Sequence, residues 1–185
     1  MNQTTKLDAS QLRQRAANIR CLFVDIDGVM TDCKLYIAAD GSELKAVNVR
    51  DGLGMKMLRQ SGVEVAVISG RPSAAMQKRL ESLGIVHIFL DQQDKIPAYE
   101  AVQSALNIAD AQCAHIGDDV LDFPLFDRVG LSMTVADAHP SALQRAQWVS
   151  RYRGGDGAIR EAVDLIMAAR AGASAAQEAT EPDIG

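Results

Sequence analysis

Short apolar runs alternate along the chain with longer stretches in which apolar residues recur at helical spacing. The runs predict five buried strands, at 21–24, 63–68, 86–90, 114–116 and 130–135. The longer stretches predict helices at 8–18, 52–61, 72–83, 96–106, 122–128, 141–147 and 158–171. Strands that alternate with helices are typical of a parallel sheet covered on both faces. The pattern therefore predicts an α/β fold with a doubly wound parallel sheet.

Segment 34–49 breaks this alternation. Within it, Asp40-Gly41 separates two halves of strand character, which is a signal for a β-hairpin. An irregular loop is the alternative, and the turn rule favours the hairpin. We expect the hairpin to protrude from the sheet as a flap.

The composition fits one globular domain. The chain has 185 residues, 48% of them hydrophobic, which is enough to bury a core without disulfides or a structural metal. Its net charge of −5 argues against non-specific binding to nucleic acid. We find no apolar run that could span a membrane and no signal peptide. The three cysteines are widely spaced and form neither a CxxC nor a Cys/His metal-binding pattern, and we therefore expect a reduced, cytoplasmic protein. Few bulky apolar residues follow Gly172, which predicts one domain over 1–172 and a disordered tail over 173–185.

Two aspartates follow the first predicted strand directly. They are Asp25 and Asp27, and Gly28 after them allows a sharp turn. In a parallel sheet, ligands bind in the crevice beyond the carboxyl ends of the strands. Carboxylates and backbone carbonyls that converge at this edge suit a hard cation such as Mg²⁺. Taken alone, the tetrapeptide is more simply an acidic turn with solvated side chains.

Three further motifs follow three other predicted strands. Ser69-Gly70 offers a hydroxyl and an N–H to a phosphate, although a serine before a helix could equally cap it. Lys95 could neutralise a phosphate, while a lone lysine is usually a solvated surface residue. Asp118 and Asp119 could complete a metal site, with an acidic loop as the alternative.

The four motifs occur in one order, and this arrangement resembles the haloacid dehalogenase (HAD) superfamily of phosphohydrolases over roughly 22–137. The resemblance implies that Asp25 is a nucleophile that forms an aspartyl-phosphate, and that Asp27 is the general acid and then the general base. It implies Mg²⁺ held by Asp25, the backbone carbonyl of Asp27 and Asp118. It also implies supporting roles: Ser69, Gly70 and Lys95 hold the phosphoryl oxygens, Asp119 orients Lys95 or the metal shell, and Asp122 caps its helix or supports the loop.

HAD enzymes usually carry a cap domain, and this chain has no room for one. The segment between Asp27 and Ser69 is long enough for only a hairpin and one helix. The segment between Ser69 and Lys95 is long enough for only one helix and one strand. The closer resemblance is to the family of 3-deoxy-D-manno-octulosonate 8-phosphate phosphatases, over roughly 19–169. It is carried by the segments 28–32, 48–54, 69–71, 116–119, 135–140 and 154–161. Cys33 departs from the family, which commonly has glycine there.

This second resemblance implies a capless phosphatase that releases inorganic phosphate and 3-deoxy-D-manno-octulosonate (Kdo), a sugar of lipopolysaccharide. It also implies a homotetramer in which the 34–49 flap of one subunit helps to close the site of a neighbour. A phosphatase of a nonulosonate 9-phosphate, or of sugar phosphates broadly, is the alternative activity. A non-catalytic assembly module is a further alternative, but it needs none of Asp25, Asp27 and Lys95.

The expected substrate carries a carboxylate as well as a phosphate, so an arginine is apt for binding it. Arg71, beside Ser69, is the first candidate. Arg50 is the second, with a structural ion pair as its alternative. His87 and His115 lie in or beside strands, and we expect them to be core histidines rather than ligands.

Overall fold

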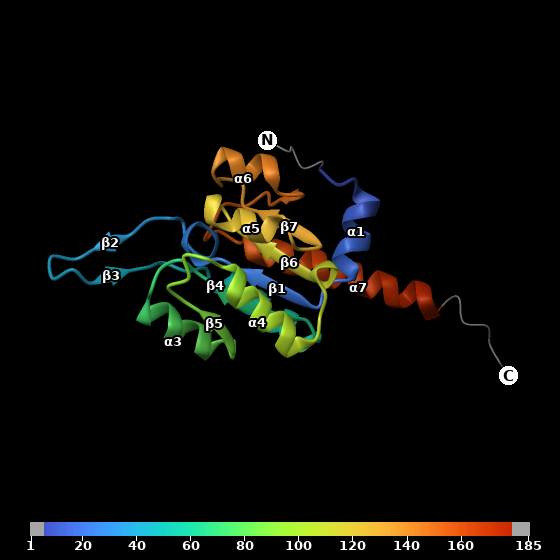
Figure 1. The fold of residues 1–185 in the computed structure, drawn as a ribbon, viewed down its shortest axis with the longest axis horizontal. Coiled ribbons are helices and arrows are strands. Elements are labelled where there is room, and N and C mark those ends of the chain that lie inside the picture. The colour runs from blue at the N-terminus through green and yellow to red at the C-terminus, as the bar shows by residue number, and fades with distance from the viewer. Residues whose placement is uncertain (1–5, 179–185) are drawn as a thin grey trace.

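A six-stranded parallel sheet forms the centre of the molecule in the computed structural model, which describes residues 6–178 (Figure 1). Its strands are β1 (Cys21–Val24), β4 (Glu64–Ile68), β5 (His87–Phe89), β6 (Cys113–Ile116), β7 (Leu131–Thr134) and β8 (Trp148–Val149). Their order is β5-β4-β1-β6-β7-β8, and every neighbouring pair is parallel. The doubly wound α/β prediction is confirmed. The sequence pattern missed β8, because two residues at a sheet edge are too few to show a period.

Helices cover both faces of the sheet, which explains why the strands are apolar without alternation. In β1, Leu22 and Val24 join one buried cluster, while Cys21 and Phe23 join the other. The first cluster includes side chains from α1 (Ala9–Ala17), α2 (Val49–Gln60), α3 (Ala74–Ser82) and α7 (Ala158–Glu178). The second includes side chains from α4 (Ile96–Leu106) and α5 (Phe123–Phe126). Beside them, α6 (Pro140–Arg145) precedes β8.

Two helix boundaries differ from the predicted ones by three residues or more. Helix α2 begins at Val49, because Asn48 caps it by accepting the N–H of Arg50 at 2.8 Å. Helix α7 continues through Gly172 to Glu178. Residues 173–178 are therefore helical, and the disordered tail predicted over 173–185 is wrong for them. One glycine costs about 1 kcal/mol in a helix, which the alanine-rich segment after it offsets. Residues 179–185 of the predicted tail lie outside the described residues.

The hairpin predicted over 34–49 is confirmed. Strands β2 (Tyr36–Ile37) and β3 (Glu43–Leu44) are antiparallel, and the Ala38 N–H donates to the Ser42 carbonyl oxygen at 2.9 Å. The hairpin projects from the body of the molecule as a flap (Figure 1). It leaves the body after Cys33, whose φ of +63° is a left-handed conformation that glycine adopts more readily. Within residues 6–178, the flap and α2 are the only elements between the β1 turn and β4, so a cap domain is absent there.

The topology brings the functional candidates to one edge. Strand β1 lies between β4 and β6, so its carboxyl end is the point where the strand order reverses. The turns after β1, β4 and β6, together with the start of α4, meet at this point (Figure 1). Within residues 6–178, no helix is both long and apolar enough to cross a membrane.

Candidate active site

The turn after β1 carries Asp25 and leaves space for the side chain of Asp118. Asp25 is 7% exposed, and its N–H donates to the Ile116 carbonyl oxygen of β6 at 3.1 Å. Gly28 then reverses the chain with a φ of +90°. A Cβ at Gly28 would lie 2.0 Å from Oδ2 of Asp118, so only glycine lets this carboxylate approach the turn. The first and fourth motifs are therefore packed against each other.

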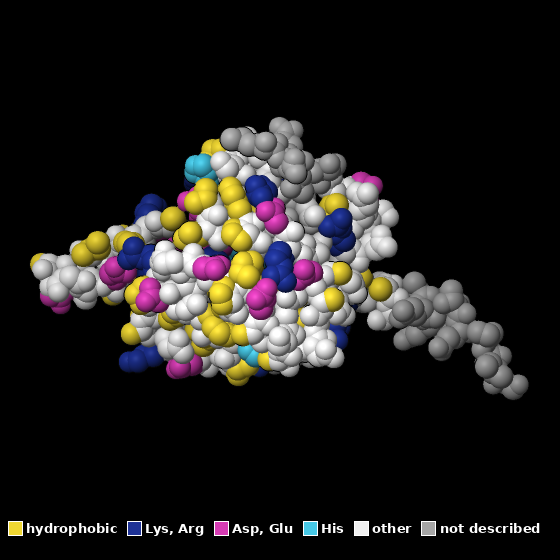
Figure 2. Space-filling model, viewed as in Figure 1, with side chains coloured by type: hydrophobic (Ala, Val, Ile, Leu, Met, Phe, Trp, Pro, Cys, Tyr) yellow, Lys and Arg dark blue, Asp and Glu magenta, His cyan; other side chains and the backbone are white. Residues whose placement is uncertain are grey.

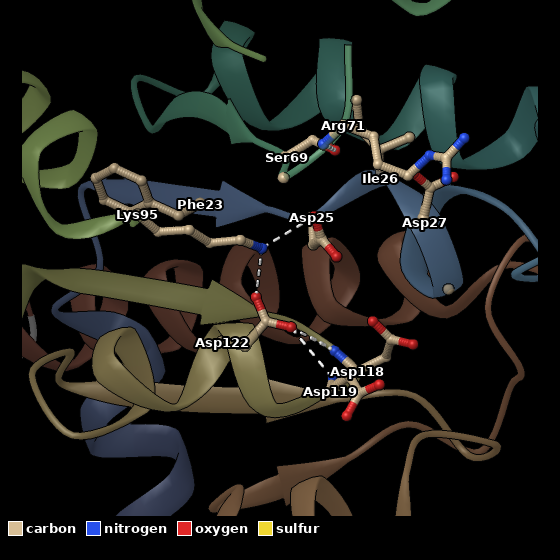
Figure 3. A network of polar contacts seen from close by, with 12 residues as sticks. Phe23, Asp25, Ile26, Asp27, Ser69, Arg71, Lys95, Asp118, Asp119 and Asp122 are labelled. Atoms are coloured by element: carbon tan, nitrogen blue, oxygen red, sulfur yellow. Dashed lines mark hydrogen bonds and ion pairs between the residues drawn. The ribbon is translucent and has the colours of Figure 1, made fainter. Parts of the chain in front are cut away.

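Lys95 is buried between two carboxylates rather than solvated on the surface (Figure 3). Its Nζ lies 3.0 Å from Oδ1 of Asp25 and 2.6 Å from Oδ1 of Asp122. Although burial opposes the charge of the ammonium, the two carboxylates raise the pKa of Lys95. Lys95 is only 2% exposed and therefore holds a buried positive charge beside Asp25.

Asp122 has both a structural role and a role in the site. Its Oδ2 accepts the N–H of Asp118 at 2.9 Å and that of Asp119 at 3.2 Å, so it supports the loop as predicted. Its Oδ1 holds Lys95, which the sequence did not suggest. Burial opposes ionisation, but the nearby ammonium holds the pKa of Asp122 well below its usual range.

Asp119 does not orient Lys95. It is exposed and accepts the N–H of Val120 at 2.7 Å, while Lys95 pairs with Asp25 and Asp122. The expectation that Asp119 contacts Lys95 is therefore wrong, and the residue three positions later holds this place. The other predicted role, toward the metal shell, remains a prediction.

Ser69 is not the cap of the following helix. That cap is Ser73, whose Oγ accepts the N–H of Met76 at 3.3 Å. Ser69 is 1% exposed, and its Oγ accepts the Arg71 N–H at 3.4 Å. The structural alternative for Ser69 is thus excluded, and its hydroxyl lines the same hollow as Asp25 and Lys95.

A cavity of about 240 Å³ joins the four motifs. Its lining comprises Asp25, Asp27, Cys33, Ser69, Gly70, Arg71, Gln93, Lys95, Asp118, Asp119, Leu121 and Asp122. All the predicted site residues except Arg50 are in this lining. Arg50 is exposed on α2 in a separate hollow that it shares with Arg151 and Arg160, so a role for it in the site of its own chain is not confirmed.

The lining has the donor chemistry of a site for a divalent cation. Oxygen atoms of Asp25, Asp118 and Asp122 lie within 4.8 Å of one another. Both oxygens of Asp122 already accept hydrogen bonds, so the carboxylates of Asp25 and Asp118 are the two available ligands. Burial raises the pKa of Asp25 to about 7, and burial together with Asp25 raises the pKa of Asp118 to about 8. A bound Mg²⁺ would offset the repulsion between these carboxylates, and oxygen ligands are those it prefers.

Asp27 is surrounded by cations from two directions. Lys45, on the base of the flap, places Nζ 2.5 Å from Oδ1 of Asp27 and has a side chain only 3% exposed. Arg71 lies beside Asp27, with Nε 3.9 Å from Oδ2 (Figure 3). It also pairs with Glu43 of the flap at 2.7 Å. Among residues 6–178, Oδ2 of Asp27 is the only buried side-chain oxygen or nitrogen without a hydrogen-bond partner. This oxygen is therefore available to exchange a proton with a bound substrate or water. No sequence pattern indicates Lys45 as a site residue, because a lone lysine is usually solvated on the surface.

Comparisons with known proteins agree with this geometry. A family model for haloacid dehalogenase-like hydrolases matches residues 81–161. The 3-deoxy-D-manno-octulosonate 8-phosphate phosphatase of Yersinia pestis is 48% identical over 162 residues, which is 88% of this chain and 87% of that protein. A crystal structure of the Y. pestis phosphatase superposes with a TM-score of 0.87, covering 89% of each chain at 47% identity. The Moraxella catarrhalis phosphatase, crystallised with a magnesium ion, phosphate and Kdo, has a TM-score of 0.86 at 33% identity, covering 94% of this chain and all of that one.

Proposed function

Because the chain belongs to the 3-deoxy-D-manno-octulosonate 8-phosphate phosphatases of the HAD superfamily, we infer that it hydrolyses this ester to Kdo and inorganic phosphate. The reaction depends on Mg²⁺ and is a step of lipopolysaccharide synthesis. The observation that carries the inference is the convergence of Asp25, Lys95 and Asp118 in one cavity at the switch point of the sheet. A non-catalytic assembly module would need neither the buried ammonium nor the crowded carboxylates.

In the proposed mechanism Asp25 is the nucleophile. One of its carboxylate oxygens attacks phosphorus, the bond between phosphorus and the sugar oxygen breaks, and an aspartyl-phosphate forms. The Oδ1 atom is engaged by Lys95, which leaves Oδ2 for the attack. Asp27 protonates the departing sugar oxygen through its free Oδ2, then takes a proton from the water that hydrolyses the aspartyl-phosphate.

The remaining residues of the cavity bind the phosphoryl group. The Lys95 ammonium, the Ser69 hydroxyl and the Gly70 N–H would hold its peripheral oxygens and stabilise their charge during transfer. Asp25, Asp118 and the backbone carbonyl of Asp27 would hold Mg²⁺, which supplies positive charge between two anions, the nucleophile and the phosphate.

The substrate carboxylate has two cationic candidates on the outer side of Asp27. Arg71 lines the cavity and is half exposed, and Lys45 of the flap reaches Asp27, which also lines the cavity. Each is paired with an acidic side chain in this structure, Asp27 for Lys45 and Glu43 for Arg71. An incoming carboxylate would compete for the same cations, so both contribute to preference for a sugar acid over a neutral sugar.

We further propose a cytoplasmic homotetramer in which the flap of each subunit covers a neighbour's site. Tyr36, Ile37 and Leu44 of the flap are 54%, 67% and 68% exposed, and hydrophobic side chains are visible along the flap in Figure 2. Exposed apolar side chains grouped on a projecting segment are typical of a contact with another chain. Sedimentation of the pure protein tests this assembly, and a lone monomer of about 20 kDa would contradict it.

The substrate assignment is tested by phosphate release from a panel of sugar phosphates, with Mg²⁺ and with chelator. The panel contains Kdo 8-phosphate, a nonulosonate 9-phosphate, neutral hexose phosphates and a small aryl phosphate. The expected result is the highest kcat/KM with Kdo 8-phosphate and no turnover in chelator. Equal or better turnover of the nine-carbon acid would support the alternative substrate, and turnover of none would contradict the function itself.

A further inference from the structure

One buried titratable side chain lies behind the site: it is not in the lining of the cavity of about 240 Å³, but it contacts Asp122, which is. We propose that His115 is a positioning residue, which fixes the Asp122 carboxylate and through it holds Lys95 in place for phosphoryl transfer. This proposal rests on the proposed function and adds a residue to its machinery. The sequence indicated only a core histidine at this position.

The contacts of the ring define its role. His115 lies on β6 with its side chain fully buried. Its Nε2 is 2.7 Å from Oδ1 of Asp122, and its Nδ1 is 3.2 Å from the carbonyl oxygen of Phe23 on β1. An ionised carboxylate only accepts hydrogen bonds, so Nε2 must carry the hydrogen. Burial lowers the pKa of His115, but Nε2–H is present both in this neutral tautomer and in the imidazolium.

With the His115 hydrogen bond, both oxygens of the Asp122 carboxylate accept two hydrogen bonds each. Oδ2 of Asp122 accepts the two N–H groups of the loop, while Oδ1 is shared between Lys95 at 2.6 Å and His115 at 2.7 Å. These donors come from the start of α4 and from residues 115–119, and together they fix both the position and the plane of the carboxyl group. A buried carboxylate that loses one donor is left undersolvated, and its other partners must compensate.

Lys95 is the partner that can move. Its Nζ is divided between Oδ1 of Asp122 and Oδ1 of Asp25, which lies 3.0 Å away. Without the His115 donor, Oδ1 of Asp122 would attract the ammonium more strongly, or the carboxyl group would rotate. Either change shifts Nζ relative to Asp25 and to the phosphoryl oxygens that it must stabilise. The effect therefore falls on the chemical step rather than on binding of the sugar.

The test compares two substitutions at this position. His115→Leu removes the donor with little change in volume, whereas His115→Gln keeps an amide N–H at a similar distance from the backbone. We expect His115→Leu to lower kcat about 10- to 100-fold, as for loss of a hydrogen bond to a charged group, with KM changed less than about threefold. His115→Gln should recover most of kcat. Turnover of the wild type is measured first, so that failure of the proposed function is seen separately.

A double-mutant cycle with Asp122→Asn tests whether His115 acts through this carboxylate. If it does, His115→Leu costs less than about threefold when added to Asp122→Asn. The ring hydrogen is checked independently of activity by ¹⁵N NMR of the wild type, with Nε2 expected to be protonated. The proposal is overturned if the two losses multiply, if His115→Gln is as slow as His115→Leu, if the loss lies in KM, or if Nε2 carries no hydrogen.

Discussion

Replacing Gly28 with alanine separates the strain of the β1 turn from the function of the site. Gly28 has a φ of +90°, which costs a residue with a Cβ about 1–2 kcal/mol. For a chain of this size, such a loss lowers Tm by about 2–8 °C. The added Cβ would also start 2.0 Å from Oδ2 of Asp118, and contacts below 3.0 Å essentially never occur. The carboxylate must therefore move by about 1 Å.

This displacement acts on a group that the proposed mechanism assigns to Mg²⁺. A shift of about 1 Å in a positioned group can cost about 100-fold in rate. We therefore expect Gly28→Ala to lower kcat/KM about 100-fold and to weaken Mg²⁺ binding. The assays are phosphate release as a function of Mg²⁺ concentration and calorimetric titration of the metal.

Gly62→Ala is the matched control. Gly62 has a φ of +82°, and a Cβ there would meet no atom within 4 Å. It should lose stability by the same amount while keeping kcat/KM within about twofold of the wild type, because the strain is similar and the clash is absent. Wild-type turnover and Mg²⁺ affinity in Gly28→Ala would refute the assignment of Asp118 as a metal ligand packed on this turn.

Three further predictions concern the flap, the support of the site and the metal. Lys45→Met should raise KM for Kdo 8-phosphate about tenfold and leave KM for a small aryl phosphate unchanged, because the aryl ester has no carboxylate; equal effects on both would contradict the assignment. Asp51→Ala should lower Tm by about 2–8 °C without changing kcat, because the buried Asp51 accepts the N–H groups of Gly157 and Arg160 at the start of α7, and a thermal melt checks this. Without metal, in the presence of a chelator, the free energy of unfolding should fall as the pH rises from about 4 to about 8. The pKa values of Asp25 and Asp118 are raised to about 7 and about 8, so in this range the native state binds more protons than the unfolded chain. Saturating Mg²⁺ should remove this decline in pH-dependent melts, and an identical decline with Mg²⁺ would contradict the proposed ligands.

The main fold and the centre of the site could be predicted because both follow from one rule. Strands of a parallel sheet end at the same edge, so motifs at their carboxyl ends must meet. This rule identifies Asp25, Ser69, Lys95 and Asp118. It holds across long sequence separations: Val24 and Ile116 are 92 residues apart in the chain and are register partners in the sheet. The cap domain could be excluded from the motif spacings alone.

The parts that could not be predicted depend on where a side chain points after folding. Lys45 follows a short hairpin strand, and only the packing of the flap against the body of the molecule buries its side chain. Arg50 was a reasonable candidate by charge, but the first turn of α2 directs it to another hollow. The pairing of Asp122 with Lys95 was missed because a local role at the loop already explained an aspartate there.

Direct detection of the aspartyl-phosphate tests the central claim, that Asp25 is the nucleophile of a Kdo 8-phosphate phosphatase. The enzyme is quenched in acid during turnover, treated with borohydride and mapped by peptide mass spectrometry. We predict reduction of one residue, Asp25, which requires both substrate and Mg²⁺ and which accumulates more in Asp27→Asn, where hydrolysis of the intermediate is slowed. Substrate-dependent modification of another residue, or none at all while phosphate is being released, would contradict the mechanism.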